Sequence, residues 1–195
     1  MARIGNVKRE TGETQIEVTI SLDGTGKADV NTGIGFFDHM LNNFARHGLF
    51  DLTVKATGDL YEDCHHLVED TGIVLGQAIL MALGDKKGIR RYGNAILPMD
   101  DALILCALDL SGRPYFAYDL KFSQPMCGYF ETAMTREFFY AVSYSAAMNL
   151  HFKMLSGEND HHIIECAFKA FAKAMDMATQ NDERITSVLS TKGIL

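Results

Sequence analysis

The chain has 195 residues and a formal net charge of −7, so it can form one substantial domain or two small ones. With 47% hydrophobic and 22% charged residues, its composition is that of a globular protein and excludes a disordered chain. The acidic balance argues against a nucleic-acid-binding surface. No apolar run approaches the roughly 20 residues of a membrane span. The longest run, residues 102–108, has the length of a buried strand.

The first residues carry no hydrophobic signal segment, so we expect a protein that is not exported. The four cysteines are widely spaced and form no CxxC pair, which favours reduced thiols over disulfides or a thiolate zinc site. Both observations predict a cytoplasmic protein.

In chain order, the first half of the sequence predicts strand, turn, strand, helix, strand, turn and helix. A strand ends in a turn at 20–24, and an apolar stretch with helical spacing begins near His39. The alternation of apolar and polar residues at 51–58 predicts a further strand. Apolar residues at helical spacing follow at 73–83. The polar stretch 84–88, which contains two glycines, closes this helix.

The same order recurs in the second half: a strand and turn at 108–112, a helical stretch near Glu137, alternation at 149–157 and helical spacing at 168–175. We therefore predict an internally duplicated α+β fold, with half-repeats over 1–87 and 88–195 that form a single structural unit. The second half-repeat includes the C-terminal tail. Each half would be a β-sheet with helices on one face, and the helix layers would pack together.

Each predicted half-repeat carries the motif HHxxE, at 65–69 and at 161–165. On a helix the glutamate is three and four residues from the two histidines and so neighbours both. The adjacent histidines diverge by about 100° and more naturally reach two different ions. Imidazole and carboxylate without thiolate suit manganese, iron or zinc. The motifs therefore predict two metal ions whose identity the spacing leaves open.

Three ligands per ion leave room for further donors from each half-repeat. His39 precedes the first motif at nearly the spacing at which Glu137 precedes the second. Four ligands per metal would leave open positions for substrate or water, as in catalytic sites. The predicted metal ligands are His39, His65, His66, Glu69, Glu137, His161, His162 and Glu165. His151 is interpreted as an ordinary strand residue, whereas His47 is compatible with either a structural or a functional role.

Several longer motifs closely resemble those of the imidazoleglycerol-phosphate dehydratase family of histidine biosynthesis. They occur in the family's order and cover essentially the whole chain: GFFDHML at 35–41, DCHHLVED at 63–70, LSGRP at 110–114, NDHHIIE at 159–165, FKAF at 168–171 and STKG at 190–193. The resemblance implies a lyase that dehydrates imidazole glycerol phosphate to imidazole acetol phosphate. It also implies two Mn²⁺ per active site, held by the eight residues above. Active sites would lie between subunits of a large octahedral homo-oligomer (24-mer).

The same resemblance implies roles for individual residues. An imidazole ring held by a metal at each nitrogen can be kept as imidazolate, which helps to expel the neighbouring hydroxyl, and a carboxylate must then move the protons. The residues expected in catalysis are Glu13, His65, Glu69, His161 and Glu165. Those expected to bind the substrate and its phosphate are Glu13, His47, Arg91, Arg113, Lys169, Ser190 and Lys192.

Two positions depart from the pattern of many family members. Glu137 stands where many have histidine, which favours a hard ion such as manganese and puts the equality of the two sites in doubt. Met126 stands where many have arginine. The repeat counterpart of Glu13 falls near Asp101.

Two other functions are compatible with a histidine-rich metal site. A metal-storage or metal-stabilised assembly protein would not use its open coordination positions, but ferritin-like storage needs four long helices with Glu and ExxH ligands. The predicted strands and the glycines argue against it. A metallohydrolase is disfavoured because no HExxH motif occurs.

Overall fold

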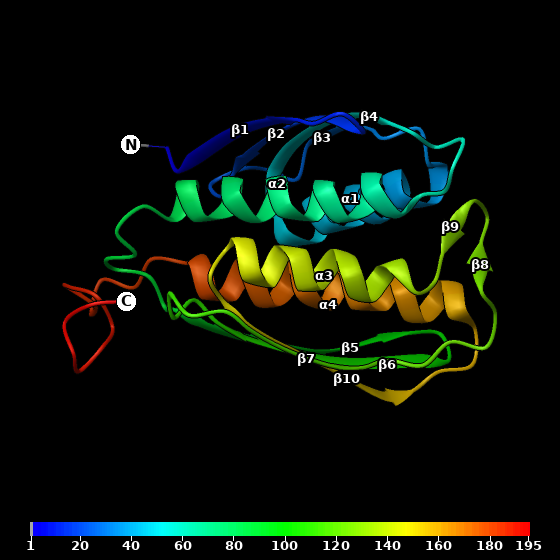
Figure 1. Cartoon of the computed structure of the whole chain (residues 1–195). Helices are drawn as coiled ribbons and strands as arrows, with labels where there is room; N and C mark the ends of the chain where they lie inside the picture. The colour runs from blue at the N-terminus through cyan, green and yellow to red at the C-terminus, as the bar shows by residue number, and fades with distance from the viewer. Residues whose placement is uncertain (1) are drawn as a thin grey trace.

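The computed structural model describes residues 2–195. Its elements stack in four layers, a sheet, two layers of helices and a second sheet (Figure 1). Across the middle, helix α2 packs on α3 and α1 packs on α4. This arrangement confirms the predicted α+β class and the packing of the two helix layers against each other.

The first sheet has the strand order β1-β2-β4-β3, in which only the β3–β4 pair is parallel. Alternate residues of β2 are buried, which places one face of the sheet on the helices. The elements are β1 (Ile4–Glu10), β2 (Thr14–Ser21), β3 (Ala28–Asn31), α1 (Gly35–Gly48), β4 (Asp51–Gly58) and α2 (His65–Leu83).

The second sheet has the corresponding order, β5-β6-β10-β7, with a parallel β10–β7 pair. Residues 84–91 connect the two sets of elements, and the boundary at 87/88 stays a prediction. The elements are β5 (Tyr92–Met99), β6 (Ala102–Asp109), β7 (Tyr115–Asp119), the hairpin β8 (Met126–Cys127) and β9 (Phe130–Glu131), α3 (Met134–Ser145), β10 (Asn149–Ser156) and α4 (Asp160–Thr179).

Two features differ from the sequence prediction. Each of the two main sheets has four strands, one more than the three strands that the sequence predicts for each half. The short strands β3 and β7 bury too few side chains to produce an alternating pattern. The apolar run 102–108 does form a strand, but only alternate residues such as Ile104 and Cys106 are buried. The strand is half-buried because α4 covers only one face of the sheet.

Phenylalanine rings fill the space between the two helix layers. Phe44 of α1 stacks on Phe171 of α4 with ring centroids 5.3 Å apart, and Phe37 of α1 packs edge-on against Phe138 of α3 at 5.3 Å. Such pairs add to the stabilisation from burial alone. Helix α2 is long and apolar enough to cross a membrane by length and composition, but 67% of that window is buried in the protein, as in a core helix.

Two glycines at corresponding strand positions bring each sheet close to a helix. A Cβ on Gly5 of β1 would lie 1.9 Å from the carbonyl oxygen of Ala78 in α2. A Cβ on Gly93 of β5 would lie 1.8 Å from that of Ala174 in α4. Both contacts involve backbone atoms, so no side-chain movement can relieve them.

We therefore expect Gly93→Ala to destabilise the fold by about 1–3 kcal/mol, the usual cost of overpacking. Thermal unfolding followed by circular dichroism would measure the fall in the transition midpoint. Gly35→Ala is the control, because a Cβ at Gly35 has no atom within 4 Å. Equal midpoints for the two variants would contradict the predicted clash.

Candidate metal centre and active site

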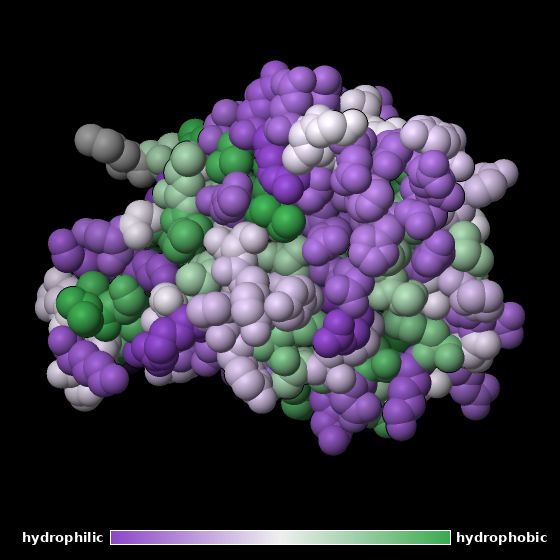
Figure 2. Space-filling model, viewed as in Figure 1, coloured by the Kyte–Doolittle hydropathy of each residue, from purple (hydrophilic) through white to green (hydrophobic). Residues whose placement is uncertain are grey.

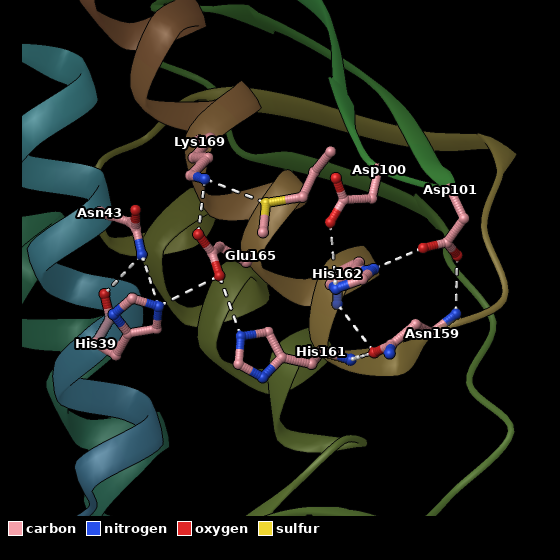
Figure 3. A network of polar contacts seen from close by, with 10 residues as sticks. His39, Asn43, Asp100, Asp101, Asn159, His161, His162, Glu165 and Lys169 are labelled. Carbon is pink, nitrogen blue, oxygen red and sulfur yellow. Dashed lines mark hydrogen bonds and ion pairs between the residues drawn. The ribbon is translucent and has the colours of Figure 1, made fainter.

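Three predicted ligands from the two helix layers meet at one point (Figure 3). His39 lies in the first turns of α1, while His161 and Glu165 lie one turn apart at the start of α4. The Glu165 Oε2 atom is 3.2 Å from His39 Nε2 and 3.1 Å from His161 Nε2. Within residues 2–195 this is the one group of three His, Cys, Asp or Glu donors whose ligand atoms all lie within 4.8 Å of one another.

The start of α4 is held in place by Asn159. Its side chain accepts hydrogen bonds from the backbone N–H groups of His161 and His162 and so caps the helix. Around the cluster, the Asn43 amide lies 3.3 Å from His39 Nε2, and the Phe36 ring packs edge-on against His161. Sequence analysis missed both neighbours, although Asn43 lies four residues after His39 on the same helix.

Glu165 is a buried carboxylate with a counter-charge. Its side chain is 7% exposed, and its second oxygen, Oε1, lies 2.6 Å from Lys169 Nζ. Burial raises the pKa of the Glu165 carboxyl, but Lys169, His39 and His161 outweigh burial and leave that pKa below its ordinary value. Glu165 is therefore ionised near neutral pH and can bind a cation.

The first motif is more open. His65 Nε2 and Glu69 Oε2 are 3.5 Å apart, and their side chains are 49% and 40% exposed. Glu137, in the first turn of α3, accepts a hydrogen bond from Arg136 at 2.8 Å. In the described chain Glu137 joins no three-donor group, so its geometry differs from that of His39 despite the similar spacing.

The second histidine of each motif points away from the motif glutamate. His66 Nδ1 lies 2.9 Å from Asp59 Oδ2 and 3.7 Å from Glu13 Oε2. These carboxylates raise the pKa of His66, Asp59 most strongly.

The second half-repeat has a similar contact. His162 Nδ1 lies 2.6 Å from Asp101 Oδ1 (Figure 3), and Asp101 is the main cause of the raised pKa of His162. The adjacent histidines thus diverge, with ring centroids 6.2 Å apart in the first motif and 6.1 Å in the second. Each glutamate lies on the same helix as both histidines of its motif, but its side chain contacts only one of them in an ion pair: Glu69 contacts His65, and Glu165 contacts His161.

Four of the predicted substrate-binding residues line one cavity of about 720 Å³. This cavity lies at the C-terminal segment, which projects from the body of the molecule (Figures 1 and 2). Arg184, which sequence analysis missed, lines it as well. The predicted residues in its wall are Arg91, Arg113, Ser190 and Lys192.

The donors of Arg91 are mostly engaged within the chain. Its Nε and Nη2 atoms bond the Asp109 carboxylate at 2.6 and 2.9 Å, and Nη1 donates to the Leu189 carbonyl at 2.7 Å. Arg91 thus ties β6 to the C-terminal segment. Arg113 is exposed and is the freer cation.

The cavity and the three-donor cluster of His39, His161 and Glu165 lie at opposite ends of α4. The Arg91 N–H donates to the Ala178 carbonyl near the helix end. His161 stands at the helix start, and the intervening turns span about 25 Å at 1.5 Å per residue. Of the other predicted substrate-binding residues, Lys169 contacts Glu165, and His47 accepts a hydrogen bond from Lys173 through its carbonyl oxygen. Burial, followed by Lys169 and Lys173, lowers the pKa of His47.

Comparison with known proteins decides the family. The family model for imidazoleglycerol-phosphate dehydratase matches residues 32–175. The chain is 60% identical to the imidazoleglycerol-phosphate dehydratase of Lachnoclostridium phytofermentans over 99% of this chain and 98% of that protein. It is 59% identical to that of Acetivibrio thermocellus over the full length of both. The chain belongs to the imidazoleglycerol-phosphate dehydratase family.

Solved structures of the family share the fold. Imidazoleglycerol-phosphate dehydratase from Staphylococcus aureus superposes with a TM-score of 0.83 at 38% identity, over 92% of this chain and 99% of that one. The Pyrococcus furiosus enzyme in complex with (S)-C348 also gives 0.83, at 39% identity over 97% and 100%. This membership confirms the predicted activity: the chain is a hydro-lyase that dehydrates imidazole glycerol phosphate in histidine biosynthesis.

The three-donor cluster predicts the effect of removing its central charge. We expect Glu165→Gln to weaken binding of a divalent metal ion, probed with Mn²⁺, by at least about tenfold, because the amide lacks the negative charge that His39 and His161 contact in Glu165. Bound metal per chain can be measured by equilibrium dialysis against buffered Mn²⁺. Glu158→Gln, at an exposed carboxylate before the same helix, should bind metal normally. Unchanged binding by Glu165→Gln would contradict a metal site at this cluster.

Proposed function

We propose that the chain performs this dehydration with two Mn²⁺ per active site, in a cytoplasmic homo-oligomer. The clustered donors are imidazole and carboxylate without sulfur, a set that suits manganese as well as iron or zinc. The resemblance to the family favours manganese among these ions. The ionised, buried Glu165 beside two histidines is the observation that carries the proposal. The proposed ligands are His39, His65, His66, Glu69, Glu137, His161, His162 and Glu165.

Bound manganese would supply positive charge at the substrate's imidazole ring, which favours the imidazolate form and departure of the neighbouring hydroxyl. Glu165 and His161 would orient this charge from the second half-repeat, and Glu69 and His65 from the first. Lys169 holds Oε1 of Glu165 and leaves Oε2 directed at the two histidines (Figure 3). The chain's part is thus to fix the position of the ring.

Glu13 would move the protons. It lies in the turn between β1 and β2, where its backbone N–H donates to the Thr11 hydroxyl at 3.1 Å. Its carboxylate is 57% exposed and lies 3.7 Å from Nδ1 of His66, a proposed metal ligand. At this distance Glu13 is close to His66 but is not hydrogen-bonded to it. A carboxylate that is exposed and close to the proposed metal ligands can accept a proton from the bound substrate and return it.

The phosphate would bind in the C-terminal cavity. The exposed Arg113 offers a planar guanidinium that can bind two phosphate oxygens, while Lys192 and Ser190 add a charge and a hydroxyl. Arg91 would hold the cavity wall through Asp109. Lys169 and His47 would contact the substrate nearer the metal.

The separation of cavity and cluster supports a site shared between subunits. About 25 Å of helix lies between the two groups in one chain, so one small substrate can use both only if different chains supply them. We therefore propose intersubunit active sites in an octahedral 24-mer. A storage or assembly role would need neither Glu13 beside the ligands nor a cationic cavity.

Turnover of imidazole glycerol phosphate tests the proposal. The wild-type protein should produce imidazole acetol phosphate with Mn²⁺ and lose activity in excess chelator. Glu13→Gln should bind Mn²⁺ and substrate normally but lose at least about 100-fold in kcat, the lower range for general acid–base catalysis. Glu17→Gln, on the adjacent strand and exposed, is the control. Metal-loaded wild-type protein without turnover would refute the manganese lyase, and an active Glu13→Gln variant would reassign the proton transfer.

Removal of metal should also change the assembly. If ligands from different chains share an ion, chelation removes intersubunit bonds and the particle should become smaller. Light scattering before and after dialysis against chelator would measure this change, and Mn²⁺ should reverse it. A particle of constant mass would argue against intersubunit metal sites.

A further inference from the structure

The second histidine of each motif is held through the same ring atom. His66 Nδ1 contacts Asp59 at 2.9 Å, and His162 Nδ1 contacts Asp101 at 2.6 Å. In both cases a loop carboxylate contacts Nδ1, while the Nε2 atom of His162 lies 3.6 Å from Oδ2 of the exposed Asp100. A neutral imidazole that donates Nδ1–H to a carboxylate keeps the lone pair of Nε2 available for a metal ion.

The two carboxylates come from different places in the fold. Asp101 belongs to the turn between β5 and β6, and it also accepts hydrogen bonds from the N–H groups of Glu158 and Asn159 at 2.5 and 2.9 Å. The corresponding turn of the first half, between β1 and β2, carries Glu13, which stays 3.7 Å from His66 Nδ1. Asp59, in the loop between β4 and α2, supplies the contact instead.

Exposure separates these residues further. The Asp59 side chain is 14% exposed, whereas that of Glu13 is 57% exposed. Asp101 makes three contacts to groups of its own chain and is thereby fixed. Within residues 2–195 the Glu13 carboxylate accepts no hydrogen bond, and its ion pair with His66 is 3.7 Å long, so it can face a substrate.

We propose that Asp59 and Asp101 are positioning residues for His66 and His162, and that Asp59 leaves the Glu13 carboxylate free in the first half-repeat. This inference rests on the proposed function, because it treats both histidines as metal ligands. A carboxylate behind a ligating histidine fixes the tautomer and the ring direction and makes the ring a better donor. The duplicated fold thus assigns two tasks to equivalent turns: orientation by Asp101 and proton transfer by Glu13.

Asp59→Asn tests the inference through metal binding rather than activity. Full-length assembled protein is dialysed against chelator-buffered Mn²⁺, and bound manganese per chain is measured. The free Mn²⁺ needed to half-saturate one of the two sites should rise about 10- to 100-fold, the usual effect of removing such a partner. Glu62→Gln, at an exposed carboxylate in the same loop, should bind like the wild type. Glu13→Gln should also bind normally.

A double-mutant cycle separates positioning from a structural role. In the His66→Ala background, Asp59→Asn should cause no further loss of affinity, because the ring that it orients is absent. Asp59→Glu, which keeps the carboxylate, should recover part of the affinity. The same loss in both backgrounds, or normal binding by Asp59→Asn alone, would overturn the inference.

Failure of the positioning inference can be distinguished from failure of the proposed function. If wild-type protein turns over substrate with Mn²⁺ but Asp59→Asn binds the metal normally, only the positioning inference fails. If wild-type protein binds Mn²⁺ tightly without turnover, the proposed function fails, whatever Asp59 does.

Discussion

The arrangement of the metal cluster depends on the buried carboxylate of Glu165. Burying a charged carboxylate destabilises the folded state unless the charge has polar or charged partners. Glu165 has three: Lys169 contacts one of its oxygens, and His39 and His161 contact the other. Lys169 and His161 come from the same helix and need only local geometry. His39 comes from the other half of the chain, so its contact requires α1 to pack on α4. The Phe44–Phe171 pair between these helices therefore stabilises the cluster as well as the core.

The duplicated fold produces two sites that are related but not equivalent. In the second motif the glutamate is 7% exposed and held by three groups, whereas Glu69 in the first motif is 40% exposed and contacts His65. Glu137, the residue at the place of His39, bonds its own neighbour Arg136. The second motif, together with His39 of the first half, thus forms a compact group of donors, whereas the donors of the first motif are more exposed. This difference agrees with ligands that are completed by another subunit.

The sequence predicted the family, the fold class and the helices that carry the candidate ligands, since repeated motifs and helical spacing are local patterns. It could not predict which way each histidine faces. The spacing placed Glu69 beside both His65 and His66, but Asp59 holds the His66 ring, and a loop residue has no periodicity to reveal that contact. The engagement of Arg91 by Asp109 was also hidden, because it depends on the register that places Tyr92 opposite Asp109.

The end of the molecule that carries the histidines and the end that carries the C-terminal cavity differ in charge. The acidic groups near the histidines include Glu13, Asp59 and Asp101, whereas the C-terminal cavity gathers arginine and lysine. The whole chain has a net charge of −7, so this basic cavity departs from the overall acidic character of the protein. An acidic end and a basic end are electrostatically complementary, so the intersubunit active sites proposed above would bring the two ends of different copies together in head-to-tail contacts. A substrate that is itself an anion would then meet cations from one chain and metal ligands from the next.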